Sequence, residues 1–247
     1  GAEFALASFD PASAEQKAQA RAGRGRRATF GFRSVRGVLF DMDGTLLDSM
    51  GVWDTIGERC LRLHGKTPQP GFRDRIRMLN LRQASTIIQQ EYGVDLPLET
   101  LMDEANRLVR EFYVREAKLK PGVLPILQEL AARKIPMRIV TATNERLADM
   151  VFRRLGLRDL FAGIDSCSAT HYGKESEECF LNAAAKIASG LDPSSVAVFE
   201  DSALALETAS RAGFRTIGLY DASAAMFQER VRAACGLYLS SFKELSL

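Results

Sequence analysis

The sequence is poor in the residues that build zinc sites and catalytic triads, since its 247 residues include two histidines, four cysteines and one tryptophan. No two cysteines form a CxxC pair, so a zinc site would need ligands from distant segments, and we reject it. Two histidines also weaken a Ser or Cys triad, which needs an imidazole base. Scattered cysteines in a long chain favour reduced, buried thiols in a cytoplasmic protein over a disulfide framework. The residues concerned are His64, His171, Cys60, Cys167, Cys179 and Cys235.

Long apolar runs are also missing from the chain. None approaches the roughly 18 residues that cross a bilayer, and Gly1–Asp10 lacks the basic and apolar segments of a secretory signal. No GxGxxG motif follows the first predicted strand, which argues against a nucleotide-binding dehydrogenase. With 46% hydrophobic and 26% charged residues, the composition is that of an ordinary globular protein. We expect no membrane partner and a large domain, with or without a smaller insert.

The charge is nearly balanced overall, at +2, but it is unevenly spread. Residues 1–36 are rich in arginine and carry a clear positive excess, whereas the rest of the chain is slightly acidic. We interpret residues 1–35 as a poorly ordered basic leader arm. Gly1–Phe4 has the form of a cloning remnant, and residues 13–22 are expected to form a short helix. A nucleic-acid tether through Arg21–Arg27 is the less favoured alternative, because few aromatic residues interleave with the charges.

From Gly37 onwards, short apolar runs alternate with helical periods. The runs at 38–40, 137–140, 195–199 and 216–219 predict strands, and the periods at 123–133, 144–155, 176–188 and 203–212 predict helices. This alternation predicts βαβ units and a parallel sheet. Continuous apolar strands are typical of a sheet that is buried on both faces. The predicted fold class is therefore α/β, with a Rossmann-like parallel sheet as its core.

One long stretch interrupts this alternation. Residues 51–117 show helical periods at 52–64, 71–78, 83–92 and 98–114 and no convincing strand. Lys120-Pro121-Gly122 then marks the return to the sheet. The sequence predicts a core formed by residues 36–50 and 118–247, and a small all-helical domain, residues 51–117, inserted after the first strand.

Polar residues follow several of the predicted strands. Asp41 and Asp43 end the first strand, Thr141 ends the second, Glu200 and Asp201 end another, and Lys174 precedes the helix that begins near Ser176. Ligands of open parallel sheets bind beyond the carboxyl ends of the strands, so these groups should meet. Four carboxylates in one place require a cation. All-oxygen ligands indicate Mg²⁺, which commonly bridges to a substrate phosphate.

These residues resemble the motifs of one family. Asp41-Met-Asp-Gly-Thr45 is similar to the DxDGT signature of the haloacid dehalogenase superfamily. Thr141, Lys174 in Gly-Lys-Glu-Ser, and Phe199-Glu-Asp-Ser202 resemble its second, third and fourth motifs, in order. The resemblance covers residues 36–240, and the insert resembles the helical cap of the β-phosphoglucomutase-like and phosphoglycolate-phosphatase-like branch. The chain departs from the pattern at Ala205, where glycine is common, and after Lys174, where Pro-x-Pro is common.

The resemblance implies a phosphatase that works through an aspartyl-phosphate. Asp41 would be the nucleophile, and Asp43 would protonate the leaving alcohol and then deprotonate water. Asp41, the backbone carbonyl of Asp43 and Asp201 would hold Mg²⁺, with Glu200 contributing directly or through water. Phosphate binding is assigned to Thr141, Ala142 and Lys174, and candidate substrate contacts are Trp53, Asn144 and the cap arginines Arg73, Arg75, Arg77 and Arg82.

Each of these residues also has a structural alternative. Asp43 and Gly44 could form a simple turn, Asn144 and Glu200-Asp201 could cap helices, and Trp53 could pack between cap helices. Trp53 stands twelve residues after Asp41, a position that resembles the one at which β-phosphoglucomutase-like enzymes carry a histidine in the first cap helix.

The function expected from these residues is a Mg²⁺-dependent phosphatase of a small phosphorylated metabolite, acting as a monomer or weak dimer. The alternatives are a phosphomutase, and a catalytically silent binding protein of the same fold. The costly buried charges Asp41, Asp43, Lys174 and Asp201 argue against the silent protein. Asp43 argues against a dehalogenase, since those enzymes have a non-acidic residue there.

Overall fold

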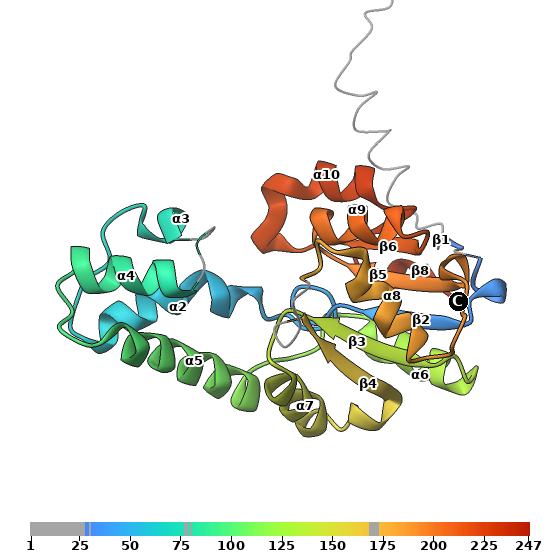
Figure 1. Cartoon of the computed structure of the whole chain (residues 1–247), viewed down its shortest axis with the longest axis horizontal. Helices are drawn as coiled ribbons and strands as arrows, with labels where there is room; N and C mark the ends of the chain where they lie inside the picture. The colour runs from blue at the N-terminus through green and yellow to red at the C-terminus, as the bar shows by residue number, and fades with distance from the viewer. Residues whose placement is uncertain (1–27, 30, 77–78, 80, 168–172) are drawn as a thin grey trace, which may run out of the picture.

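The computed structural model describes residues 28–29, 31–76, 79, 81–167 and 173–247 (Figure 1). At its centre is a six-stranded sheet in the order β4-β3-β2-β5-β6-β7, in which every neighbouring pair is parallel. This confirms the predicted α/β class and parallel sheet. The strands are β2 (Gly37–Phe40), β3 (Met137–Thr141), β4 (Phe161–Ser166), β5 (Val196–Glu200), β6 (Arg215–Leu219) and β7 (Leu237–Leu239). The helices that accompany them are α6 (Val123–Ala132), α7 (Glu145–Arg154), α8 (Glu177–Ala185), α9 (Ala203–Arg211) and α10 (Gln228–Ala234).

Strand β2, at the centre of the sheet, has an apolar sequence because it is buried on both faces. Val38 and Phe40 belong to the hydrophobic cluster that contains residues of α6 and α7. Leu39, which points to the opposite face, belongs to a second cluster with residues of α8 and α9. Helices therefore cover both faces of the sheet, and a strand buried on both faces shows no polar alternation.

Two strands of this sheet were not predicted from the sequence. β4 is an edge strand that includes Ala162, Gly163 and Asp165, residues with low β-propensity, and only half of its six positions are buried. β7 is the other edge and has three residues. Edge strands lack the long apolar run that identifies a central strand, because they face solvent on one side.

The core begins earlier in the chain than residue 36, the predicted boundary. β1 (Ala28–Thr29) pairs in parallel with β8 (Leu245–Ser246), next to the C-terminus. The 3-10 helix η1 (Phe32–Ser34) buries Phe32, whose ring stacks on Phe199 at a centroid distance of 6.4 Å. This corrects the assignment of residues 28, 29 and 31–35 to the leader arm. The rest of the arm, including the helix expected over 13–22, lies outside the described residues.

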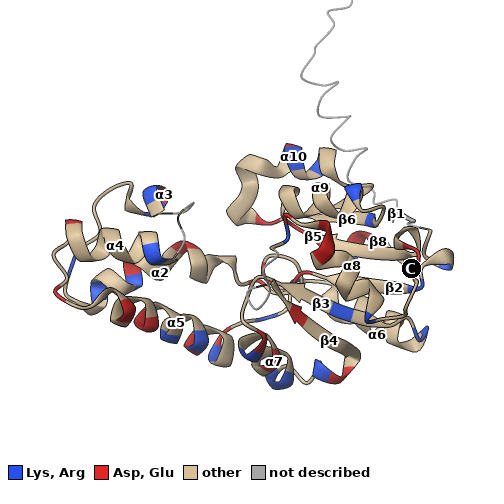
Figure 2. Cartoon of the chain, viewed as in Figure 1, with Lys and Arg blue, Asp and Glu red and all other residues tan. Residues whose placement is uncertain are grey.

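The helical insert forms a separate lobe at one end of the molecule, on the left in Figure 1. Figure 2 shows basic and acidic residues interspersed along its long helix α5, so that the outer face of this helix presents both signs of charge to solvent. None of the helices in the described part of the chain is long and apolar enough to cross a membrane. The helices of the lobe, here called the cap, are α2 (Met50–Leu63), α3 (Phe72–Ile76), α4 (Leu81–Glu91) and α5 (Leu98–Arg115).

Two chain crossings join the cap to the core, and they lie side by side. The backbone N–H of Asp48 donates to the carbonyl of Lys118 at 2.9 Å, and that of Lys120 donates to the carbonyl of Leu46 at 2.9 Å. The Lys120 ammonium also donates to the carbonyl of Gly44 and forms a 2.7 Å ion pair with Asp221. The crossings are thus anchored to the loop that follows β2, which carries the first motif.

Candidate active site

A cavity of about 800 Å³ lies between the carboxyl ends of the strands and the cap. The strand register explains how distant residues reach it. Phe40 pairs with both Ile139 and Phe199, so the next residue, Asp41, lies level with Glu200. The lining residues are Asp41, Asp43, Met50, Trp53, Asn106, Val109, Thr141, Ala142, Thr143, Asn144, Leu147, Lys174, Glu200, Asp201 and Ser202.

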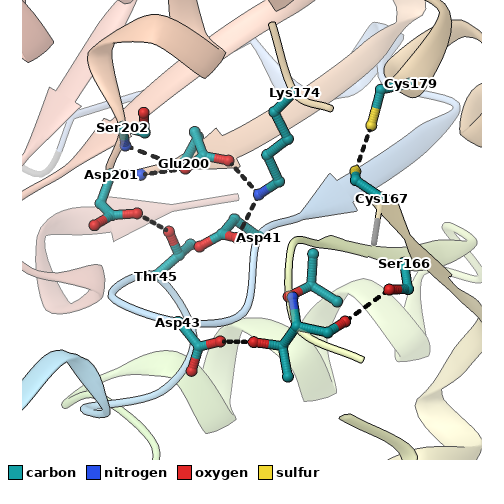
Figure 3. A network of polar contacts seen from close by, with 12 residues as sticks. Asp41, Asp43, Thr45, Ser166, Cys167, Lys174, Cys179, Glu200, Asp201 and Ser202 are labelled. Carbon is teal, nitrogen blue, oxygen red and sulfur yellow. Dashed lines mark hydrogen bonds and ion pairs between the residues drawn. The ribbon is translucent and has the colours of Figure 1, made fainter. Parts of the chain in front are cut away.

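Lys174 links two carboxylates at the floor of this cavity (Figure 3). Its ammonium donates to Asp41 Oδ1 and, at 2.7 Å, to Glu200 Oε2. Burial by itself would lower the pKa of Lys174, but the adjacent carboxylates of Asp41 and Glu200 raise it above its ordinary value. Lys174 is therefore a permanently charged donor that touches the predicted nucleophile.

The oxygen atoms around Asp41 fit a divalent cation. Asp41, Glu200 and Asp201 each offer a carboxylate oxygen, and these oxygens lie within 4.8 Å of one another. The second oxygen of Asp41, Oδ2, is buried and accepts no hydrogen bond from the described residues. Burial, followed by the charges of Asp41 and Glu200, raises the pKa of Asp201 well above its usual range. One ammonium cannot neutralise three buried carboxylates, so this all-oxygen donor set suits a divalent cation.

Gly44 lets the first motif approach the fourth. Its φ of +83° lies in the left-handed region that favours glycine. A Cβ atom at this position would lie 2.3 Å from Asp201 Oδ2, too close for any other residue. The next residue, Thr45, donates a 3.3 Å hydrogen bond to Asp201 Oδ1. The glycine of DxDGT therefore brings the loop of Asp41 against Asp201.

Asp43 is held by three hydroxyl groups. Ser49 Oγ and Tyr113 Oη each donate to its Oδ1 at 2.6 Å, and Thr143 Oγ1 donates to its Oδ2 at 2.7 Å. Burial raises the pKa of Asp43, while the three hydrogen bonds, from Ser49, Tyr113 and Thr143, partly offset that rise. A carboxyl group with a raised pKa and a fixed orientation is suited to proton transfer.

Sequence reasoning missed these three partners of Asp43. Ser49 and Thr143 stand close to the first and second motifs, so their positions were a usable signal. Tyr113 gave none, because in the sequence it is one more half-apolar residue of a predicted helix. Only the packing of α5 against the core brings its hydroxyl group to Asp43.

Asn144 and Glu200, for which the sequence left helix capping and a role in the site both open, each line the cavity and accept hydrogen bonds from the backbone. Asn144 lines the cavity, and its Oδ1 also accepts from the backbone N–H of Arg146, which caps α7. Glu200 Oε1 accepts from the N–H groups of Asp201 and Ser202 at the start of α9, while its Oε2 contacts Lys174. These backbone hydrogen bonds fix the orientation of both side chains within the site.

The cap contributes Trp53, Asn106 and Val109 to the cavity wall. Trp53 is 37% exposed, so it faces the cavity rather than being buried between cap helices. Arg82 is not brought to the site, because it pairs with Glu99 at 2.9 Å elsewhere on the cap. His64 forms a 2.7 Å hydrogen bond with Glu104 within the cap. Arg73 pairs with Glu58 and Arg75 with Glu91, whereas Arg77 and His171 lie outside the described residues.

Comparison with known proteins agrees with the geometry of the site. The sequence profile of the haloacid dehalogenase-like hydrolases matches residues 35–213. A Drosophila melanogaster protein named "Probable pseudouridine-5'-phosphatase" is 29% identical over 196 residues, which cover 76% of this chain and 83% of that one. A phosphorylated carbohydrates phosphatase of Thermotoga maritima is 26% identical over 183 residues, covering 74% and 84% of the two chains.

The fold is shared with solved structures as well. A hydrolase of the same superfamily from Entamoeba histolytica superposes with a TM-score of 0.70 at 22% identity, over 86% of this chain and 96% of that one. The profile match spans most of the chain and includes all four motifs, from Asp41 to Asp201. The chain therefore belongs to the haloacid dehalogenase-like hydrolase family and is an enzyme of that family.

Proposed function

We propose that this enzyme is a Mg²⁺-dependent phosphatase that hydrolyses a small phosphorylated metabolite through an aspartyl-phosphate on Asp41. The observation that carries the proposal is the environment of Asp41. One of its oxygens contacts the Lys174 ammonium, while the other is buried beside Glu200 and Asp201 without a hydrogen-bond donor among the described residues. The names of the two curated relatives, both phosphatases, support the same reaction class.

In the proposed reaction, a carboxylate oxygen of Asp41 attacks phosphorus and the bond to the leaving alcohol breaks. Asp43 gives its proton to that alcohol oxygen, and its raised pKa suits it to enter the reaction protonated. Asp43 then accepts a proton from water, which attacks the aspartyl-phosphate, releases inorganic phosphate and restores Asp41.

The charge that develops on the phosphoryl oxygens would be stabilised by groups already in place. Lys174 is positioned as a cation, and Thr141 and Ala142 line the same side of the cavity. When bound by Asp41, Glu200 and Asp201, Mg²⁺ would shield the phosphate from the carboxylates and polarise its oxygens.

The cavity wall supports a small polar substrate. Its volume of about 800 Å³ accommodates a phosphate with a sugar or nucleoside attached. Trp53 offers an aromatic face and Asn106 an amide, a pair suited to a ring with hydroxyl groups. We propose a phosphorylated sugar or nucleoside as the substrate class, in line with the relatives' names.

The test is phosphate release from a panel of phosphorylated sugars, small acids and nucleotides, with Mg²⁺ or with EDTA. The Asp41→Asn variant is expected to lose turnover, because its amide is a poor nucleophile, and EDTA is expected to abolish the wild-type activity. Asp95→Asn, which alters an exposed carboxylate of the cap, serves as the control and should retain activity. Turnover that persists in EDTA or in Asp41→Asn would contradict the proposal.

The phosphomutase alternative makes a separate prediction. Trp53, which lines the cavity where that branch carries a histidine, has an indole N–H that donates but cannot relay a proton. Water is therefore the expected phosphoryl acceptor. Incubation with β-glucose 1-phosphate and trace bisphosphate distinguishes the two reactions, since glucose 6-phosphate forming faster than phosphate would favour the mutase.

A further inference from the structure

Two thiols are in contact beside the active site. Cys167 directly follows β4, and Cys179 lies in α8, twelve positions later. Their Sγ atoms are 2.7 Å apart. Figure 3 shows both side chains close to that of Lys174. Neither sulfur has a role in the proposed hydrolysis. In the sequence, however, Lys174 lies between the two cysteines.

The geometry of this pair is close to that of a cystine. A disulfide bond has an S–S length of about 2.05 Å, so closure requires the two sulfur atoms to move together by roughly 0.7 Å. The elements that carry them are well anchored, because Phe180 of α8 is fully buried in the core and Ser166 of β4 donates to the Thr143 carbonyl at 2.8 Å. Cys179 is half-buried and Cys167 is 9% exposed, so an oxidant of this pair has to be small.

The surroundings also favour reaction at Cys167. The hydrogen bond with Cys179 lowers the pKa of Cys167, and the nearby Lys174 ammonium lowers it further, against the effect of burial. The same contact raises the pKa of Cys179. Thiolate is the reactive form of cysteine, so the two thiols differ in role: Cys167 attacks first, and Cys179 resolves.

We propose that Cys167 and Cys179 are a redox modification site, in which a reversible disulfide forms and lowers the activity of the enzyme by displacing Lys174. The oxidant is a small peroxide, and the reductant that restores the thiols is a dithiol. Disulfide formation depends only on the two thiols, whereas its effect on activity rests on the proposed hydrolysis.

The electrons and atoms balance in two steps. The Cys167 sulfur attacks one oxygen of hydrogen peroxide, the O–O bond breaks, and the products are a sulfenic acid on Cys167 and one water. The Cys179 sulfur then attacks the Cys167 sulfur, the S–O bond breaks, and the departing hydroxide takes the remaining thiol proton to form a second water. Two thiols and one peroxide thus give one disulfide and two waters, and thiol–disulfide exchange with a dithiol reverses the change.

The link to activity is the position of Lys174 between the two cysteines. Its ammonium contacts both Asp41 and Glu200, so a shift of the backbone on either side changes both contacts. A misplacement of about 1 Å near reacting groups can cost about 100-fold in rate. Lys174 stands five residues before Cys179 on the same segment, so we expect disulfide closure to displace its ammonium and to lower kcat by at least about tenfold.

The first experiment locates the bond without using turnover. The full chain is treated with hydrogen peroxide under native conditions, alkylated, digested and analysed by mass spectrometry. A 167–179 linked peptide that disappears after dithiothreitol is expected. Cys179→Ser should not form it, whereas the matched control Cys235→Ser, which changes another half-buried thiol, should form it as the wild type does. Absence of the linked peptide in the wild type would overturn the proposal.

The second experiment measures the consequence for Lys174. The kcat of phosphate release and the Kd for inorganic phosphate are compared before oxidation, after oxidation and after reduction. The proposal requires a reversible loss of activity and a weaker phosphate affinity in the wild type and Cys235→Ser, and neither in Cys179→Ser. An oxidised enzyme with the bond but unchanged kcat and Kd would overturn control by this pair. If neither redox state hydrolysed phosphate esters or bound phosphate, the proposed hydrolysis and the control of activity would both fail, whereas the 167–179 linked peptide would still decide whether the pair is a redox site.

Discussion

Tyr113 Oη donates a 2.6 Å hydrogen bond to Asp43 Oδ1, which joins the last helix of the cap to the loop that follows β2. Tyr113 is fully buried near the end of α5, and Arg154 of α7 donates to its backbone carbonyl at 2.9 Å. A cap residue thus contacts a core carboxyl group and a core helix at once. The orientation of Asp43 therefore depends on where the cap sits.

Removing the hydroxyl group with Tyr113→Phe should shift the pH dependence of turnover. The Tyr113 hydrogen bond lowers the pKa of Asp43, so its loss raises that pKa further. Asp43 must be ionised to accept a proton from water, and the acidic limb of the kcat profile should move to higher pH. A hydrogen bond to a charged group is worth about 1.5–3 kcal/mol, which corresponds to a shift of about one pH unit or more. Tyr92→Phe, which alters a cap hydroxyl group bonded to Gln69, is the control and should leave the profile unchanged.

Replacing the proposed proton-transfer group with Asp43→Asn should lower kcat by at least about 100-fold, the usual scale of general acid–base catalysis. An amide can neither protonate the leaving alcohol nor accept a proton from water. Steady-state phosphate release and circular dichroism together measure the loss and show that the fold is kept. Near-normal kcat in this variant would remove the assigned role.

Asp201→Asn should stabilise the metal-free protein while destroying its function. Burial raises the pKa of Asp201 in the folded state, so the folded chain binds more protons than the unfolded chain and stability falls as pH rises through that range. Above the pH range in which an unfolded aspartate ionises, the buried carboxyl group therefore costs stability, and the amide removes that cost. With EDTA, Tm should rise by at least about 2–4 °C, which corresponds to about 1 kcal/mol for a chain of this size.

The same variant should respond differently to Mg²⁺. Ligand binding to the folded state raises the wild-type Tm, whereas the variant, with one carboxylate fewer, should show little gain. Thermal melts with EDTA and with Mg²⁺ give the comparison, and Asp95→Asn is the control for a loss of charge elsewhere. An Asp201→Asn variant that is less stable than wild type in EDTA would show that these carboxylates are structural.

Two changes in the N-terminal region, a deletion and a substitution, should differ in their effect on stability. Deletion of residues 1–27 should leave Tm and turnover unchanged, because no motif lies there. Phe32→Ala should lower the free energy of unfolding by about 3–5 kcal/mol, since its buried ring stacks on Phe199. Chemical denaturation of the two variants provides the measurement. Equal stability in both would show that Phe32 is dispensable.

The sequence by itself determined much of the catalytic floor of this protein. Asp41, Thr141, Glu200 and Asp201 follow apolar strands, and parallel strands place their carboxyl ends at one edge, so these residues had to converge. They meet in one cavity because β2 lies between β3 and β5, an order and register that the sequence pattern did not specify.

Tertiary structure decided what the local pattern does not contain. Tyr113 reaches Asp43 because α5 packs against the core, Arg82 pairs with Glu99 away from the site, and Cys167 meets Cys179 through the docking of α8. The burial of Phe32 likewise depends on Phe199, far along the chain. No pattern in the sequence around these residues indicates that they are in contact. They are fixed only when the hydrophobic faces of separate elements are buried together.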